Sequence, residues 1–309
     1  MAGTERGTKA QLAKKLGVSR ASLYYRHQLP AKDLALRQVI EAVMAENPGY
    51  GSPRVAMALK INRKRISRVM KKFSLKPARR SKTPRKPFDQ GREPLPVPNI
   101  VKKLSPIVPN FVWVSDFTYI RFQGIFVYLC TVLDLFTGEV LGSNIGLTHD
   151  ATFVWMSIQR AVRKAGGFPA WFHSDQGSEY ASETVQRWLQ SNGTQISMSF
   201  KSSPWWNGSQ ESFFGRFKVE FGDFDRFESL PDLIEALYQH LRYFSQDRIK
   251  SKLRMSPVQF RKNWERQMAS LPPGPPSFLS LPTPCLISKG GTAGYPAGPC
   301  PSFSSLPNS

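Results

Sequence analysis

Apolar residues recur at two spacings along this chain: every three to four residues in its first quarter, and every second residue in its middle. Over residues 8–26 the helical spacing stops at Gly17 and resumes after Ser19, a favoured residue for starting a helix. Ala13, Gly17 and Leu23 have the spacing of two short crossing helices, because helices approach closely only where the residues between them are small. This segment therefore predicts a helix-turn-helix.

A second helical pair is predicted over residues 53–74, after a helix at 34–46. Asn62 is a suitable N-cap for its second helix. The apolar stripe of that helix consists of Ile66, Val69, Met70 and Phe73. Its many basic side chains either contact DNA or form an ordinary solvated face, and two such patterns close together favour DNA contact. In the two helical pairs we expect DNA contacts from Arg20, Tyr24, Arg63, Lys64, Arg65 and Arg68.

From about residue 110 the pattern becomes that of β-strands, and Gln123-Gly124 marks a hairpin turn between the first two. The expected strands are 111–122, 125–136, 140–147, 170–173 and 195–199. The expected helices are 150–165, 178–192 and a long stretch from about 207. Three antiparallel strands followed by alternating helices and strands predict a mixed α/β sheet.

These changes of pattern divide the chain into four zones. Residues 1–74 form the helical DNA-binding region, 75–107 a basic, Pro-rich linker, and 108–262 an α/β core. Residues 263–309 form a Pro-rich tail. Ten of the 25 prolines and a single charged residue lie within 271–309, so we expect this tail to be disordered.

The charge is concentrated at the amino-terminal end. Residues 1–105 contain 25 basic and 6 acidic side chains, a net charge of +19, out of +21 for the whole chain. A concentrated excess of this size favours a polyanionic partner, because binding releases the counterions of that partner. Nucleic acid is therefore favoured over a merely basic, soluble protein.

No apolar run approaches the ~20 residues of a membrane span, and the first residues lack the apolar segment of a secretory signal. The three cysteines, Cys130, Cys285 and Cys300, do not have the spacing of metal ligands. We therefore expect a cytoplasmic protein with no membrane partner.

Three acidic residues are candidates for a metal site that acts on phosphodiester bonds. Such a site needs carboxylates from separate elements, because Mg²⁺ prefers oxygen ligands. Asp116 lies within the first expected strand, Asp175 directly follows a short strand, and Glu211 begins a helix. Each also has a simpler reading: a buried ion-pair partner for Asp116, a helix cap for Asp175 and a first-turn acid for Glu211.

The segments around these acids resemble insertion-sequence transposases of the OrfB type, which have an integrase-like (DDE) catalytic core. The matching segments are residues 113–120 (WVSDFTYI), 173–180 (HSDQGSEY) and 211–220 (ESFFGRFKVE). Thirty-five residues lie between Asp175 and Glu211, the interval that the resemblance predicts. Gly49-Tyr50-Gly51 and Asn62-Arg63-Lys64-Arg65 also stand in the expected places, so the resemblance covers about residues 8–262.

The resemblance implies a ribonuclease H-like core in which Asp116, Asp175 and Glu211 bind Mg²⁺ or Mn²⁺ and catalyse DNA cleavage and strand transfer by a 3′-hydroxyl. It implies transposon ends and target DNA as partners, a homo-multimer, and a bacterial, nucleoid-associated location. It leaves open a partner protein from a neighbouring reading frame. The chain departs from the family pattern at Trp206-Asn207-Gly208, where Asp-Asn-Ala is frequent, and at Lys250, where histidine is frequent.

Glu220 competes with Glu211 for the third position, but nine residues turn a helix by about 180°, so the two cannot point to one site. Lys218, about 20° from Glu211, either contacts a phosphate beside the metals or is solvated. His173 is either a substrate-orienting group or a packed side chain, and Trp205 and Trp206 either stack on an unpaired base or pack locally. Two other functions remain: a nuclease without joining activity, and a DNA-binding regulator derived from a transposase.

Overall fold

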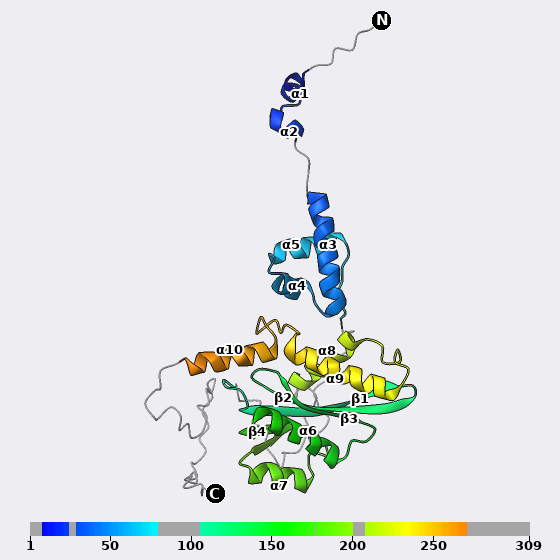
Figure 1. Ribbon diagram of the computed structural model, residues 1–309, viewed down its shortest axis with the longest axis vertical. Helices are drawn as coiled ribbons and strands as arrows, with labels where there is room; N and C mark the ends of the chain where they lie inside the picture. The colour runs from blue at the N-terminus through cyan, green and yellow to red at the C-terminus, as the bar shows by residue number, and fades with distance from the viewer. Residues whose placement is uncertain (1–7, 25–28, 80–105, 176, 200–207, 271–309) are drawn as a thin grey trace, which may run out of the picture.

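The computed structural model describes residues 8–24, 29–79, 106–175, 177–199 and 208–270 (Figure 1). Most of the predicted linker and all of the tail from residue 271 lie outside the described residues, as do Trp205 and Trp206. Within the described part, no helix has both the length and the apolar character needed to cross a membrane.

The first helical pair is α1 (Lys9–Lys15) and α2 (Arg20–Tyr24). Gly17 between them has a φ of +64°, which glycine adopts without strain, and Ser22 N donates to Ser19 Oγ at 3.2 Å. Ala13 is buried at the crossing. The predicted turn and the predicted helix start at Ser19 are both confirmed.

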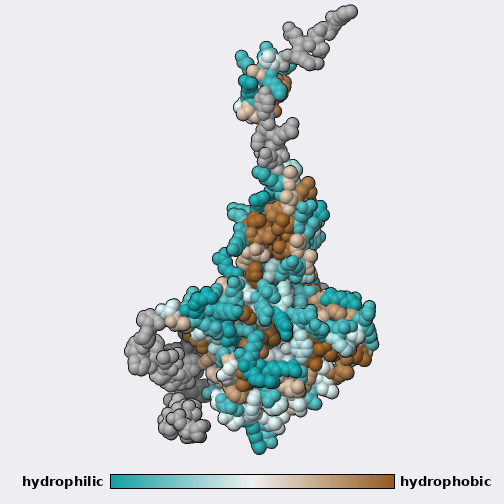
Figure 2. Space-filling view, in the orientation of Figure 1, coloured by the Kyte–Doolittle hydropathy of each residue, from teal (hydrophilic) through white to brown (hydrophobic). Residues whose placement is uncertain are grey.

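A three-helix unit follows, made of α3 (Leu29–Glu46), α4 (Ser52–Leu59) and α5 (Arg63–Lys72). Asn62 caps α5 by accepting a hydrogen bond from Lys64 N at 2.9 Å. The predicted stripe of α5 faces the small core of this unit, in which Ile66 and Val69 are fully buried. Figure 2 shows apolar surface on this unit above the more hydrophilic core domain. Among the described residues of this unit, Leu34 and Val39 of α3 are the large apolar side chains that are exposed.

The core contains one five-stranded sheet with the order β3-β2-β1-β4-β5. Its strands are β1 (Val112–Phe122), β2 (Ile125–Asp134), β3 (Val140–Gly146), β4 (Trp171–Ser174) and β5 (Gln195–Met198). β1, β2 and β3 are antiparallel neighbours, whereas β4 is parallel to both β1 and β5. Gln123 and Gly124 both have positive φ, which confirms the predicted hairpin turn. This mixed sheet confirms the predicted ribonuclease H-like α/β fold.

Helices cover both faces of the sheet (Figure 1). α6 (Ala151–Ala165) and α7 (Glu183–Ser191) pack on one face, and α8 (Gly208–Phe221) and α9 (Leu230–Gln246) pack on the other. Alternate residues of β1 serve the two sides: Val112 and Val114 contact the α8–α9 layer, and Trp113 contacts the α6–α7 layer. The sheet is therefore buried between two apolar cores.

Several boundaries differ from the sequence prediction, among them the start of α3, which lies at Leu29 rather than at residue 34. α7 begins at Glu183 rather than near 178, because residues 178–181 form a turn after Asp175. The expected long helical stretch is divided into α8 and α9. A further helix, α10 (Pro257–Ala269), continues past the expected end of the core at residue 262.

The three-helix unit is joined to the core by side-chain contacts. Tyr50 Oη accepts a hydrogen bond from Ile249 N at 2.6 Å, and Tyr243 Oη donates to Asn47 Oδ1 at 2.8 Å. Gly49 lies so close to Glu220 of α8 that a β-carbon at this position would overlap the carboxylate. The Gly49-Tyr50 segment is thus a contact between the two units.

Candidate active site

Parallel pairing of β1 and β4 brings Asp116 and Asp175 together. Val114 is opposite His173 in the register, and each aspartate lies two residues further along its own chain. Residues two apart on a strand point to the same face, so both carboxylates leave the sheet near the carboxyl end of β4. The two acids are 59 positions apart in the sequence, and the sheet makes them neighbours.

The pKa of Asp116 is raised to about 7, first because burial disfavours its charged form and second because the Asp175 carboxylate repels it. One hydrogen bond opposes this shift, from Phe117 N to Asp116 Oδ1 at 2.8 Å. Two neighbouring buried carboxylates with so little compensation form a site that a cation would stabilise.

Asp175 is held by the turn that follows β4. Gly177 N donates to Asp175 Oδ1 at 3.0 Å, and a β-carbon at Gly177 would lie 3.2 Å from that oxygen and 2.7 Å from Glu179 Oε2. Glycine therefore allows the backbone to approach the carboxylates closely. Burial raises the pKa of Asp175, and the Glu179 carboxylate raises it further.

The beginning of α8 is fixed to the sheet beside Asp116 by Gln210, which is completely buried. Gln210 Nε2 donates to Val114 O at 2.7 Å, and Thr131 Oγ1 donates to Gln210 Oε1 at 3.2 Å. Thr131 is the cross-strand partner of Asp116, so its side chain lies on the same face of the sheet. The backbone of Glu211, the next residue, is thereby held on the Asp116 side of the sheet.

Glu211 itself is an exposed side chain in the first turn of α8. Among the described residues, no three His, Cys, Asp or Glu side chains are grouped closely enough to hold one metal ion. The structure thus brings Asp116 and Asp175 together and places Glu211 on the adjoining helix. All three offer oxygen donors, the chemistry that suits Mg²⁺ or Mn²⁺.

A hollow of about 630 Å³ adjoins the turn after Asp175. His149 Nδ1 lies 2.7 Å from Glu179 Oε1 on its wall, and the His149 ring packs against Tyr128 with ring centroids 4.4 Å apart. Neither aspartate lines this hollow, which borders the turn at Ser178 and Glu179.

The rival acids have other roles. Glu220 is buried and forms a bidentate ion pair with Arg248, whose Nε lies 2.6 Å from Oε2 and whose Nη2 lies 2.5 Å from Oε1. Asp134 holds the turn after β2, accepting hydrogen bonds from Thr137 N at 3.0 Å and Thr137 Oγ1 at 2.6 Å. Both carboxylates are thus engaged away from the metal site, and for Glu220 this agrees with its predicted position about 180° around the helix from Glu211.

His173 is a packed side chain. It is 1% exposed, its Nδ1 lies 3.0 Å from Ser197 Oγ, and burial lowers its pKa to about 4. Lys218 Nζ donates to Tyr119 O at 2.7 Å, and burial lowers the pKa of this amine. The Lys218 amine therefore lies beside β1 at Tyr119, three residues along the strand from Asp116.

The residues expected to contact DNA are placed as follows. Arg20, Arg63, Lys64 and Arg65 are exposed, and the side chain of Tyr24 lies outside the described residues. Arg68 has an internal partner, since its Nη2 lies 2.6 Å from an oxygen of Asp33, which is 1% exposed. Sequence patterns gave no sign of this pair or of the Gln210 anchor, because both depend on residues distant in the chain.

Comparison with known proteins gives matches over the same segments. Residues 108–204 and 211–264 match the integrase core domain family. An uncharacterized transposase-like protein of Haemophilus influenzae is 31% identical over 205 residues, covering 66% of this chain and 94% of that protein. The putative transposase InsK for insertion sequence element IS150 of Escherichia coli is 30% identical over 264 residues, covering 81% and 92%.

Solved integrase structures also match. The HTLV-2 integrase catalytic core domain in complex with magnesium has a TM-score of 0.43 at 18% identity and covers 51% of this chain and 99% of that one. A simian T-cell lymphotropic virus intasome has a TM-score of 0.47 at 16% identity, with coverage of 78% and 81%.

Proposed function

Because this chain belongs to the family of insertion-sequence transposases with an integrase core domain, we propose that Asp116, Asp175 and Glu211 hold the divalent cations with which it cuts and joins DNA. The observation that carries the proposal is the neighbouring pair of buried aspartates: burial raises both pKa values, Asp175 raises that of Asp116 further, and Glu179 raises that of Asp175. An uncompensated pair of this kind is stabilised by a cation.

Glu211 completes the site from α8. Its side chain is exposed, so it can change rotamer without unfolding the helix, while the Gln210 anchor keeps its backbone beside β1. Three carboxylates from β1, β4 and α8 form an all-oxygen donor set, which fits Mg²⁺ and equally Mn²⁺.

Bound cations in such a site neutralise the phosphate and activate the attacking oxygen. The protein's own residues provide position and surroundings. The sheet holds Asp116 and Asp175 at a fixed separation, and Gly177 N restrains the Asp175 carboxylate. The Lys218 amine adds positive charge at the β1 edge, where it can contact a phosphate of the strand being cut.

The helical units bind transposon-end DNA in this proposal. The exposed cations Arg20, Arg63, Lys64 and Arg65 supply phosphate and base contacts, together with Tyr24 and the outer face of Arg68. The net charge of +19 over residues 1–105 supports DNA as the partner. Two ends must be brought together for transposition, so we expect a homo-multimer on DNA.

The test uses labelled duplexes that carry the ends of the insertion sequence from which the gene comes, with Mg²⁺ and a target plasmid. Wild-type protein is expected to cleave the ends and join them to the plasmid. Asp175→Asn is expected to bind the duplex and to lose cleavage by at least a hundredfold. Asp247→Asn, an exposed aspartate at the end of α9, is the matched control and should retain activity.

Other outcomes distinguish the alternatives. Cleavage without joining would identify a nuclease. Equal inactivity of wild type and Asp175→Asn, with DNA binding intact, would identify a regulator and refute the proposal.

A further inference from the structure

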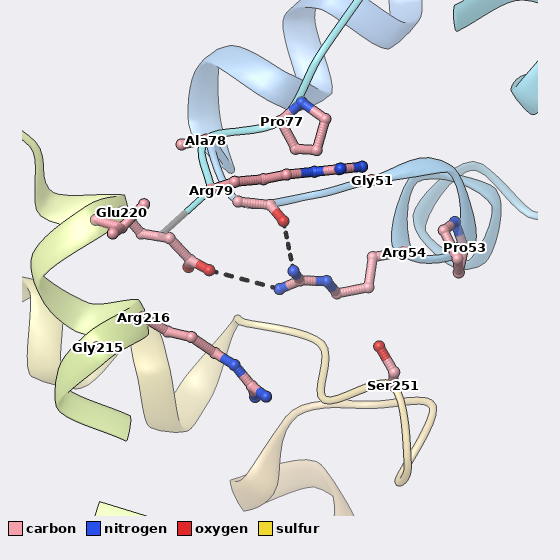
Figure 3. Close-up of a pocket in the computed structure, with 12 residues that line it drawn as sticks. Gly51, Pro53, Arg54, Pro77, Ala78, Arg79, Gly215, Arg216, Glu220 and Ser251 are labelled. Atoms are coloured by element: carbon pink, nitrogen blue, oxygen red, sulfur yellow. Dashed lines mark hydrogen bonds and ion pairs between the residues drawn. The ribbon is translucent and has the colours of Figure 1, made fainter. Parts of the chain in front are cut away.

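A second basic site lies where the three-helix unit meets the core. A pocket of about 380 Å³ is enclosed by the start of α4, residues 77–79 and the middle of α8. Figure 3 shows Arg54 extending from α4 toward Glu220 of α8, with Arg79 on one side of it and Arg216 on the other. The three arginines come from three different segments, and they face a common space.

The positive charge of this pocket is incompletely compensated. Glu220 is the one acidic residue among its described lining residues. Both oxygens of that carboxylate are already engaged by Arg248, at 2.5 and 2.6 Å. Arg54 Nη1 lies 3.7 Å from Glu220 Oε1 and, although buried, has no hydrogen-bond partner. A buried guanidinium nitrogen without an acceptor is costly, so an additional acceptor would be stabilising.

Repulsion between neighbouring cations also favours an anion in this pocket. The pKa of Arg54 and that of Arg216 are both lowered, first by desolvation and second by repulsion from Arg248. Lys250 is affected as well: burial lowers its pKa to about 8, and repulsion from Arg248 and Arg216 contributes. Cations that repel one another across a small pocket favour a bound anion.

We propose that this pocket binds a backbone phosphate of DNA, held by Arg54, Arg79 and Arg216. Guanidinium groups match phosphate oxygens in geometry, and the pocket has room for a phosphate together with its sugar. Arg216 is five residues after Glu211, about 7.5 Å along the helix axis. The two residues are also about 140° apart around the helix, so DNA that occupies both the pocket and the proposed cutting site must curve around α8.

The same contact would link the two units. Arg54 belongs to the three-helix unit and Arg216 to the core, so a phosphate between them bridges the two. The pocket thus makes DNA binding and the seating of the helical unit on α8 mutually favourable. The inference relies on the proposed function only for the identity of the polyanion.

The experiment measures DNA affinity without cleavage. Full-length protein binds a fluorescein-labelled 40-base-pair duplex carrying an insertion-sequence end, without divalent metal, and anisotropy is recorded over a range of salt concentrations. Each phosphate contact contributes about 0.9 to the slope of log K against log salt. Arg216→Gln and Arg79→Gln are each expected to lower that slope by about one contact and to weaken binding about tenfold at low salt.

Arg163→Gln on α6 is the matched control, because it removes the same charge from an exposed position on the other face of the sheet. Its slope should change less than those of the two pocket variants. Equal changes in all three variants would overturn the proposal. A second result would also overturn it. If inorganic phosphate stabilised the wild type but not Arg216→Gln, while Arg216→Gln kept the wild-type salt slope for DNA, the pocket would hold a free anion and not a phosphate of DNA. Failure of the metal site would instead abolish cleavage while leaving these slopes unchanged.

Discussion

Replacing Gln210 with methionine tests whether the buried glutamine positions α8, the helix that carries the proposed metal ligand Glu211. Methionine has nearly the same length and volume, so the substitution removes hydrogen bonds while preserving packing. It eliminates the bond to Val114 O at 2.7 Å and the one accepted from Thr131 at 3.2 Å, both fully buried. Groups left without partners cost about 1–3 kcal/mol each, so we expect the free energy of unfolding to fall by about 2–4 kcal/mol.

The catalytic effect should be larger than the loss of stability suggests. The bonds of Gln210 hold the first turn of α8 beside β1, and a displacement of about 1 Å in a catalytic group can reduce the rate about a hundredfold. We therefore expect Mg²⁺-dependent end cleavage to fall by about that factor. The Mn²⁺ concentration needed for half-maximal cleavage should rise, because Glu211 is no longer held near the aspartates, and DNA affinity should stay the same.

The assays are single-turnover cleavage of a labelled end, anisotropy for DNA binding, and urea unfolding. Gln239→Met provides a matched control, since Gln239 is exposed on α9 and bonds only to Glu235 in the same helix, at 3.1 Å. Cleavage by Gln210→Met within twofold of the wild type, together with the expected loss of stability, would refute the positioning role.

Three further predictions concern other parts of the fold. Gly49→Ala should lower the free energy of unfolding by about 1–3 kcal/mol, because the new β-carbon would overlap Glu220. Gly51→Ala is the control and should be tolerated, because its β-carbon would lie 3.6 Å from Pro77. Equal effects of the two substitutions in thermal melts would contradict this prediction. Glu220→Gln should destabilise the protein by about 3–5 kcal/mol, because it leaves the buried charge of Arg248 unpaired. Glu211→Gln should abolish cleavage with little change in stability. The reverse pattern in cleavage assays and urea unfolding would show that Glu220 is the catalytic acid and Glu211 the structural one. Burial lowers the pKa of His240 to about 4 from 6.5, so the folded state resists protonation that the unfolded state accepts. The contribution of His240 to the free energy of unfolding should be constant above pH 6.5 and fall by up to about 3 kcal/mol as the pH drops toward 4. Urea unfolding of His240→Phe should therefore show a smaller loss of stability over that pH range than the wild type.

Much of the fold could be predicted from local patterns. All five strands begin within one residue of the predicted positions, because alternating apolar residues and glycine turns are local signals. The break between α8 and α9 was missed, although Gly222, with a φ of +86°, and the N-cap Ser229 are local signals of a helix end and a helix start. Local apolar spacing reports which face is buried and says little about where a helix ends.

The candidate site was only partly predictable. Motif spacing singled out Asp116 and Asp175, and the sheet register explains why they meet. The role of Gln210 could not be predicted, because its partners Val114 and Thr131 belong to other elements. Similarly, no local signal indicates that Arg68 turns toward Asp33, 35 positions earlier in the chain.

The central claim is that three acids from β1, β4 and α8 share divalent cations. The most direct measurement is the anomalous difference density of a crystal of this protein soaked in Mn²⁺. A peak bounded by the carboxylates of Asp116, Asp175 and Glu211, and absent in a matched Asp116→Asn crystal, is the predicted result. Full Mn²⁺ occupancy elsewhere in the protein, with no peak between the two aspartates, would contradict the account.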